Sequence, residues 1–292
     1  MGNFYLYKIA QFLTHRLPLS VSYALAVFLS DCQYLLSKTD REAVEANLKV
    51  VLNTDQVPPA MVREVFHNFG KYLADFFTMT KRVNGEFIKN SVKIEGIDHL
   101  NEVLHKGKGG IILSAHLGNW EMGAALVGLL GYPLSIVALA HQDDRVNNFF
   151  NSQREFFGIT VIQTNVALRR CLEHLKRNRL IAILADRDFG HHGLLMDFLG
   201  RKAIIPQGAA LFALKTGAPI IPVFFLRAQQ NSFHITFGQP IDPPPMDEGR
   251  ISNEEIEQFT KKYLPLIEEQ IRQNPGQWLM FRRFENVCPS PY

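Results

Sequence analysis

The chain has 292 residues, of which 47% are hydrophobic and 20% are charged. This balance is typical of a globular protein with a substantial core, and it excludes a disordered, collagen-like or disulfide-stapled chain. Lysine and arginine number 31 against 28 acidic residues, and the formal net charge of +3 is too small for a protein defined by nucleic-acid binding. The three cysteines (Cys32, Cys171 and Cys288) have neither CxxC nor zinc spacing, so we expect buried or idle thiols in a reducing compartment.

The N-terminal forty residues contain one long apolar run. Residues 17–36 would extend about 30 Å as a helix, which is enough in principle to cross a bilayer. Asp31 interrupts the run and Pro18 suits a helix start, so the sequence favours an amphipathic or half-embedded membrane anchor over a true span. A buried core helix is the remaining alternative.

Amphipathic helices are predicted over residues 41–51 and 59–78, because apolar residues recur there at spacings of three and four. Beyond residue 90, short β-branched runs alternate with helical segments. Strands are predicted at 91–96, 109–116, 135–140, 160–163, 180–186, 219–227 and 232–241, and helices at 101–107, 119–131, 145–158, 167–178, 207–217 and 253–274.

This alternation predicts an α/β fold with a mainly parallel central sheet that is flanked by helices on both faces. No internal repeat, linker or low-complexity stretch divides the chain. We therefore expect one compact domain over residues 41–292, with an N-terminal helical membrane-associating extension over residues 1–40.

The first candidate site follows the apolar run 109–114. In open α/β sheets ligands collect beyond the carboxyl ends of strands, and His116 lies at such an end. With a tight turn at Gly118, the Glu121 carboxylate could reach one imidazole nitrogen and leave the other as a base. Amides near Gly118 and Asn119 would hold an oxyanion at the helix start. The alternative is a satisfied core histidine beside an acidic residue that the helix dipole favours.

The second candidate site follows the predicted strand 180–186. Asp186, Arg187 and Asp188 put three charges at its end, and Arg187 could hold a phosphate or carboxylate bidentately. A metal site is disfavoured, because adjacent histidines such as His191 and His192 rarely ligate the same ion. The remaining alternative is a solvated turn.

Other catalytic signatures are missing from the sequence. It has no GxSxG nucleophile motif, no GxxxxGK[ST] phosphate loop, no HExxH and no GxGxxG after the first strand. The pairs Arg169–Arg170 and Lys176–Arg177 lie on one predicted helix, which indicates a solvated face. A dock for an acidic carrier protein or for anionic headgroups is the weaker interpretation.

The HLGNWE block at 116–121 resembles the His-four-residues-acid motif of the lysophospholipid acyltransferase superfamily. It is most similar to the branch that acylates lipid A precursors in Gram-negative bacteria, the lauroyl and myristoyl acyltransferases. The similarity extends to FHNFGKYLADFF, NSQREFFG, LADRDFG, DFLGRKAIIPQGAALFALKTGAPIIPV and NPGQWLMFRRFEN. That branch commonly has an Asp-Gln-Asp type block at 186–188. With Arg187 in the middle of this block, the chain is instead similar to relatives that acylate mannosylated phosphoinositides.

The resemblance implies a glycerolipid-acyltransferase-like fold and an enzyme at the cytoplasmic face of the bacterial inner membrane. Such an enzyme moves a fatty acyl group from an acyl carrier protein or coenzyme A thioester to a lipid hydroxyl, as in lipid A and lipopolysaccharide biosynthesis. We expect no metal, no other cofactor and no covalent acyl-enzyme, because the candidate base has no serine or cysteine nucleophile motif beside it. His116 is expected to be the general base, and Glu121 its orienting partner. Main-chain donors near Gly118 and Asn119 are expected to stabilise the carbonyl oxygen. The residues expected to contact the acceptor headgroup or the donor phosphate are Arg154, Asp186, Arg187 and Asp188.

Three alternatives remain at this point. The acceptor could be a glycerolipid, so that the product is phosphatidic acid. It could instead be a mannosylated phosphoinositide. A catalytically silent lipid-binding protein with the same fold is the third possibility.

Overall fold

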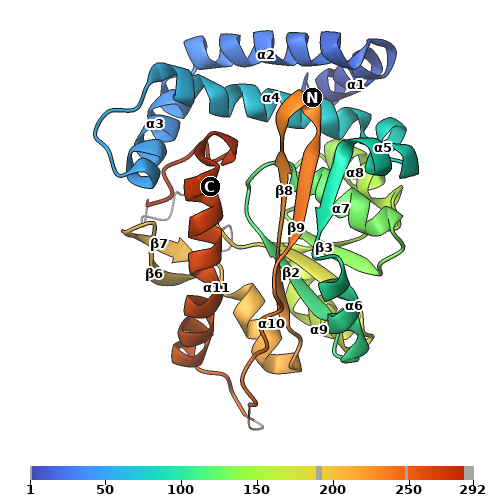
Figure 1. Cartoon of the computed structure of the whole chain (residues 1–292), viewed down its shortest axis with the longest axis vertical. Coiled ribbons are helices and arrows are strands. Elements are labelled where there is room, and N and C mark those ends of the chain that lie inside the picture. The colour runs from blue at the N-terminus through green and yellow to red at the C-terminus, as the bar shows by residue number, and fades with distance from the viewer. Residues whose placement is uncertain (1, 189–192, 247–248, 286–292) are drawn as a thin grey trace.

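The computed structural model describes residues 2–188, 193–246 and 249–285. Seven strands form a central sheet in the order β1-β9-β8-β2-β5-β3-β4, and β6 pairs with β7 in a separate hairpin (Figure 1). The strands are β1 (Val92–Glu95), β2 (Gly110–Ser114), β3 (Leu134–Ala138), β4 (Thr160–Gln163), β5 (Leu180–Leu184), β6 (Leu194–Phe198), β7 (Arg201–Ile205), β8 (Ile220–Arg227) and β9 (Phe233–Phe237).

Neighbouring strands of the central sheet are parallel except for β8 and β9, which run antiparallel. The prediction of a mainly parallel α/β sheet is confirmed. The helices are α1 (Gly2–Arg16), α2 (Leu19–Leu36), α3 (Lys38–Leu52), α4 (Pro59–Arg82), α5 (Gly85–Ser91), α6 (Asp98–His105), α7 (Trp120–Leu129), α8 (Asp144–Glu155), α9 (Ala167–Lys176), α10 (Gly208–Thr216) and α11 (Asn253–Gln273).

The core lies on both faces of the sheet, and β2 shows how the sequence builds it. All five residues of β2 are buried, as expected of a central parallel strand. Because side chains alternate along a strand, Ile111 and Leu113 join a cluster with α9, α10 and α11, whereas Ile112 joins a cluster with α4, α6, α7 and α8. The apolar run that marked this strand in the sequence therefore serves two cores.

The β6–β7 hairpin was not predicted. Its strands pair antiparallel, and the turn between them has Leu199 at φ 55° and Gly200 at φ 83°. A two-residue turn with both φ values positive matches the right-handed twist of the two strands in a hairpin. Glycine at the second position adopts a positive φ without steric cost. The Leu-Gly pair in DFLGRKA was the only local signal.

Helices α1 and α2 lie at one end of the molecule, and α2 runs along α4 (Figure 1). The close approach depends on Gly70 of α4, where an added Cβ would lie 2.2 Å from Ser30 Oγ and 2.7 Å from the Ala26 carbonyl oxygen. The buried residues of α2 are Ser22, Tyr23 and Ser30. By length and composition α2 could cross a membrane, yet one side of it packs against the protein.

The outward sides of α1 and α2 are apolar. Their exposed large hydrophobic residues are Tyr5, Leu6, Ile9, Phe12 and Leu13 on α1 and Val21, Leu25, Phe28, Leu29, Leu35 and Leu36 on α2. We call this set the apolar face. A buried core helix would not leave such a set in solvent, so the apolar face fits a membrane-associating extension.

Candidate active site

The register of two parallel strands brings His116 and Asp186 together. Ser114, the last residue of β2, pairs with Leu184, the last residue of β5. His116 and Asp186 each lie two residues beyond those ends, so the in-register sheet places them side by side at its carboxyl edge. The ladder extends one step past the strands, because the Ala185 amide donates to the Ser114 carbonyl at 2.9 Å.

Asp186 collects donors on both of its oxygens. His116 Nδ1 lies 2.9 Å from Asp186 Oδ1, and the His116 main-chain amide lies 3.1 Å from each oxygen. The indole of Trp278 donates to Oδ2 at 2.9 Å. The Asp186 side chain is fully buried. Burial alone raises the pKa of this carboxyl, but the adjacent His116 and the donated hydrogen bonds outweigh it and hold the pKa below its usual value.

This geometry defines the imidazole tautomer. A carboxylate accepts and cannot donate, so Nδ1 carries the proton and Nε2 carries the lone pair. The His116 side chain is 15% exposed, while its partner is inaccessible. The arrangement can therefore act as a general base whose imidazolium form is stabilised by a buried carboxylate.

The prediction that Glu121 orients His116 is wrong, because Asp186 has that place. Arg154 of α8 holds Glu121 instead, with Nη2 2.6 Å from Oε1 and Nε 3.0 Å from Oε2. Burial alone lowers the pKa of Arg154, but the paired Glu121 carboxylate outweighs it and raises the pKa above its usual value. Such a buried bidentate pair locks α7 to α8.

The structure also differs from the prediction that the Gly118 and Asn119 amides are oxyanion donors. The Gly118 amide donates to the Gln277 carbonyl at 2.9 Å, and the Asn119 amide donates to the Phe225 carbonyl at 2.8 Å. Both are therefore engaged within the fold. Gly118 has φ +67°, and an added Cβ would lie 2.2 Å from the Phe225 carbonyl oxygen, so only glycine fits this turn.

Asn119 is the N-cap of α7, and its Oδ1 accepts from the Met122 amide at 3.2 Å. The next residue, Trp120, lies beside the imidazole, with ring centroids 5.0 Å apart in an edge-to-face arrangement. The Trp120 ring also stacks on Tyr72 at 4.5 Å. An aromatic wall thus borders His116 on the α4 side.

Arg187 and Asp188 follow Asp186 directly and are half-buried. Burial and the nearby positive charge of Arg282 lower the pKa of Arg187 to about 10. The neighbouring Asp186 carboxylate acts in the opposite direction and raises this pKa. A guanidinium group thus follows directly after Asp186, and such a group can bind a phosphate or carboxylate bidentately.

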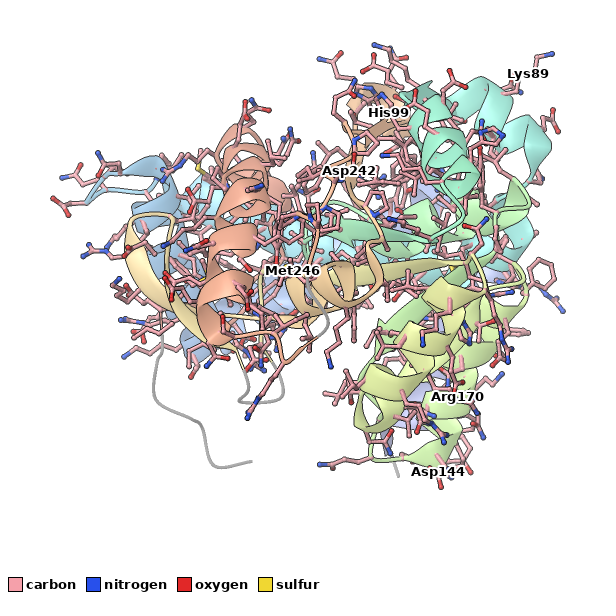
Figure 2. All side chains as sticks on the ribbon, turned by 90° about the horizontal axis from the view of Figure 1, so that it is seen from below. Lys89, His99, Asp144, Arg170, Asp242 and Met246 are labelled. Carbon is pink, nitrogen blue, oxygen red and sulfur yellow. The ribbon has the colours of Figure 1, made fainter. Side chains whose placement is uncertain are left out.

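Within residues 2–188, 193–246 and 249–285, no three His, Cys, Asp or Glu side chains are arranged to hold a metal ion. His191 and His192, which entered the metal alternative, lie outside the described residues, as does Cys288. The basic residues of α9 lie at the surface, where Arg170 is seen in Figure 2. Arg169 and Arg170 both pair with Glu173, which favours the solvated-face interpretation.

Sequence reasoning missed Trp278 and its neighbours as part of this site. The C-terminal segment NPGQWLMFRRFEN was noticed only through its family resemblance. In the fold, the Leu279 amide donates to the His116 carbonyl at 2.8 Å, next to the Trp278 contact to Asp186. A tryptophan in a segment without helix or strand periodicity was the one available hint.

Together these features define an α/β protein with a histidine–aspartate pair at the carboxyl edge of its sheet and an apolar helical surface at one end. The chain belongs to the bacterial lipid A biosynthesis acyltransferase family, whose model matches residues 1–285. The family resemblance found in the sequence is thereby confirmed.

Two relatives show how the family similarity is distributed. Over 207 residues the chain is 29% identical to the phosphatidylinositol mannoside acyltransferase of Mycolicibacterium smegmatis. The aligned region covers 68% of this chain and 67% of that protein. Over 205 residues it is 27% identical to the phosphatidylinositol mannoside acyltransferase of Mycobacterium tuberculosis H37Rv, which covers 67% of this chain and 64% of that protein. The matched region thus spans about two thirds of these relatives.

Proposed function

We propose that this protein transfers a fatty acyl group from an acyl thioester to a hydroxyl of a membrane lipid or glycolipid. The donor is an acyl carrier protein or coenzyme A thioester. The observation that carries the proposal is the 2.9 Å contact between His116 Nδ1 and the buried Asp186 carboxylate at the sheet's carboxyl edge. Family membership supplies the reaction class.

The chemical step needs one base and two proton transfers. The acceptor hydroxyl gives its proton to His116 Nε2 while its oxygen attacks the thioester carbonyl carbon. The tetrahedral intermediate collapses, the carbon–sulfur bond breaks, and the imidazolium returns the proton to the leaving thiolate. Asp186 stays ionised throughout and stabilises the imidazolium. General-base assistance of this kind typically contributes about 10²–10⁴-fold.

The apolar face, together with Lys8 and Arg16, is proposed to rest on a membrane surface. A helix with one apolar side and cationic residues beside it lies in the interface, because burial of apolar side chains and attraction to anionic lipids both favour it. Residues 1–40 would then be the membrane-associating segment and 41–292 the acyltransferase domain. Because the thioester donors are intracellular, this surface would belong to the cytoplasmic face of the bacterial inner membrane.

The acceptor is proposed to be a glycolipid with a sugar hydroxyl. The family description points to a lipid A precursor, whereas the similar proteins named above are phosphatidylinositol mannoside acyltransferases. The arginine at position 187 supports a mannosylated phosphoinositide over a lipid A precursor. A glycerolipid acceptor and a non-catalytic lipid-binding role are kept as outcomes of the test.

The test supplies purified full-length protein with radiolabelled acyl-CoA or acyl carrier protein thioester. Separate vesicles contain a mannosylated phosphoinositide, a lipid A precursor or a lysophosphatidate. Mass spectrometry should find the label as an ester on one of the two glycolipids. Transfer only to lysophosphatidate would replace the acceptor class, and binding of lipid without transfer to any acceptor would identify a lipid-binding protein.

Arg187 provides a separate prediction about recognition. Arg187→Gln should raise KM for the phosphate-bearing acceptor about 10-fold to 100-fold, because a charge-assisted hydrogen bond contributes about 1.5–3 kcal/mol. The value of kcat should change less. Steady-state kinetics with varied acceptor measures both constants. Arg169→Gln, an exposed arginine of α9, is the matched control. A fall in kcat at unchanged KM would contradict a binding role for Arg187.

A further inference from the structure

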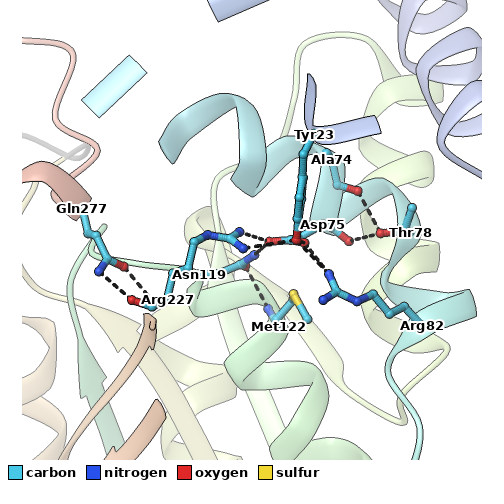
Figure 3. Close-up of polar contacts among 9 residues, drawn as sticks. All are labelled: Tyr23, Ala74, Asp75, Thr78, Arg82, Asn119, Met122, Arg227 and Gln277. Carbon is cyan, nitrogen blue, oxygen red and sulfur yellow. Dashed lines mark hydrogen bonds and ion pairs between the residues drawn. The ribbon is translucent and has the colours of Figure 1, made fainter. Parts of the chain in front are cut away.

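A second buried charged cluster lies between α2, α4, α7 and β8, and Figure 3 shows its contacts. Its centre is Asp75 of α4, whose side chain is fully buried. Arg82 Nη1 lies 2.7 Å from Asp75 Oδ1, and the Tyr23 hydroxyl donates to the same oxygen. Asp75 Oδ2 accepts from Asn119 Nδ2 at 3.1 Å and from Arg227. Both carboxylate oxygens are thus satisfied.

The partners of Asp75 come from parts of the chain that the active site also uses. Asn119 caps α7 immediately after the turn that carries His116. Arg227 ends β8, and its main chain is held at both polar atoms by the Gln277 side chain, at 2.9 Å from the amide and 3.0 Å from the carbonyl oxygen. The cluster is therefore joined to the neighbourhood of His116 by two attachments: the first runs through Asn119, and the second runs through Arg227 and Gln277.

The second attachment continues through residues 277–279. The Gln277 carbonyl accepts from Gly118, Trp278 donates to Asp186, and Leu279 donates to the His116 carbonyl. A shift of Asp75 would thus act on His116 from the Asn119 side and on Asp186 from the Trp278 side. No residue of the cluster itself contacts the imidazole in these hydrogen bonds.

Tyr23 connects the cluster to α2, one of the two helices that carry the apolar face. Its hydroxyl also accepts from Arg82 at 2.9 Å and from Arg227 at 3.1 Å. The contact of α2 with α4 at Gly70 leaves no room for α2 to move closer. The Tyr23 hydroxyl therefore links α2, which carries part of the apolar face, directly to Asp75.

A role in stability alone explains this cluster poorly. Burying ions costs several kcal/mol each, and replacing a buried ion pair with apolar residues is often neutral or stabilising. Here two guanidinium groups surround one carboxylate, so the cluster retains positive charge in a buried place. Fixing the relative positions of four elements is the gain that such a cluster offers.

We propose that Asp75 is a positioning residue of the acyl-transfer site, and that Tyr23 makes the placement of His116 and Asp186 depend on how α2 is seated on a lipid surface. This proposal rests on the proposed function: its kinetic test uses the proposed acyl transfer, and its structural test uses the proposed membrane contact of the apolar face. Its structural test needs no reaction.

The structural test uses tryptophan emission, because Trp120 and Trp278 are the two tryptophans of the chain. In a Trp120→Phe background, Trp278 at the Asp186 carboxylate is the single reporter. Vesicles of phosphatidylglycerol and phosphatidylcholine should shift its emission. Adding Tyr23→Phe should abolish the shift while co-sedimentation with the vesicles stays unchanged.

Tyr34→Phe is the matched control, since Tyr34 lies on the same helix and packs edge-on against Phe66 at 5.4 Å. In the described part of the chain, no hydrogen bond joins its hydroxyl to the site. This variant should keep the full shift. An emission shift that survives Tyr23→Phe, or that is missing from a Trp120→Phe parent that co-sediments with the vesicles, would overturn the coupling. A parent that fails to co-sediment would overturn both this coupling and the proposed membrane contact.

The kinetic test separates positioning from folding. Tyr23→Phe should lower kcat about 2-fold to 30-fold, the range that 0.5–2 kcal/mol of coupling produces, with KM for both substrates unchanged. Asp75→Asn should lower kcat about 10²-fold, as expected for a displaced catalytic geometry. If Asp75→Asn does not fold, Tyr23→Phe decides alone. An unaltered kcat in a folded variant would refute the positioning role, whereas failure of the wild type to transfer would refute only the proposed function.

Discussion

His116→Ala is expected to lower kcat for acyl transfer about 10²–10⁴-fold while the protein stays folded. Alanine removes the group that is placed to take the hydroxyl proton, whereas the Asp186 carboxylate stays behind its main-chain and indole donors. Transfer of a radiolabelled acyl group from a thioester to the acceptor, followed in single turnovers, measures the effect on the chemical step itself.

The matched control is His105→Ala at the exposed end of α6, which should leave kcat unchanged. Thermal unfolding should give similar midpoints for both variants, since the His116 side chain is partly exposed and fills little of the core. Near-normal transfer by His116→Ala would remove the imidazole from the mechanism, although the acyl-transfer activity itself would stand.

The architecture was predictable because local hydrophobic patterns in the sequence indicate each strand and helix. Short apolar runs rich in isoleucine and leucine, such as 110–114 and 180–184, indicated buried strands between helices, because they are too short for typical helices. The antiparallel step from β8 to β9 was not predictable in the same way. Strand direction depends on the short connection through residues 228–232, and the sequence there gives no strong hairpin signal.

The site was predictable only as far as neighbours in sequence determine it. His116 and Glu121 are five positions apart, so they were paired on proximity. The actual partner lies 70 positions away and is selected by the register between β2 and β5. Arg154 was named as a headgroup contact, yet its fork fits the Glu121 carboxylate and neutralises it within the fold.

Buried charge was the signal that could have revealed the rest. Asp75 stands in the run YLADFF, where its position on the helix puts it among apolar residues. A carboxylate on a buried helix face requires partners, and arginine and tyrosine are the residues that supply them. The sequence does not show which arginines pair with Asp75, because the pairing depends on the tertiary fold. Arg227, for example, lies 152 positions further along the chain.

Asp186→Asn is expected to reduce kcat about 10²–10⁴-fold, close to the loss of the base itself. Three donor groups converge on Asp186: the His116 amide, His116 Nδ1 and the Trp278 indole. An asparagine offers one accepting oxygen, and its NH₂ group must face a donor. The imidazole then loses either its orientation or its tautomer, and the buried mismatch lowers the free energy of unfolding by about 1–3 kcal/mol.

The same substitution makes a prediction about pH. The folded protein holds the pKa of Asp186 below its usual value, so ionised Asp186 adds stability that is fully present above the ordinary aspartate pKa of 3.8 and is lost as the pH falls through the folded-state pKa. The amide of the Asp186→Asn variant cannot ionise. The difference in unfolding free energy between wild type and this variant should therefore be largest at neutral pH and shrink in acid. Denaturant unfolding at neutral pH and in acid measures it, with Asp188→Asn as the control at a half-buried site. A difference that grows in acid would mean that His116 and Trp278 do not stabilise the ionised carboxylate.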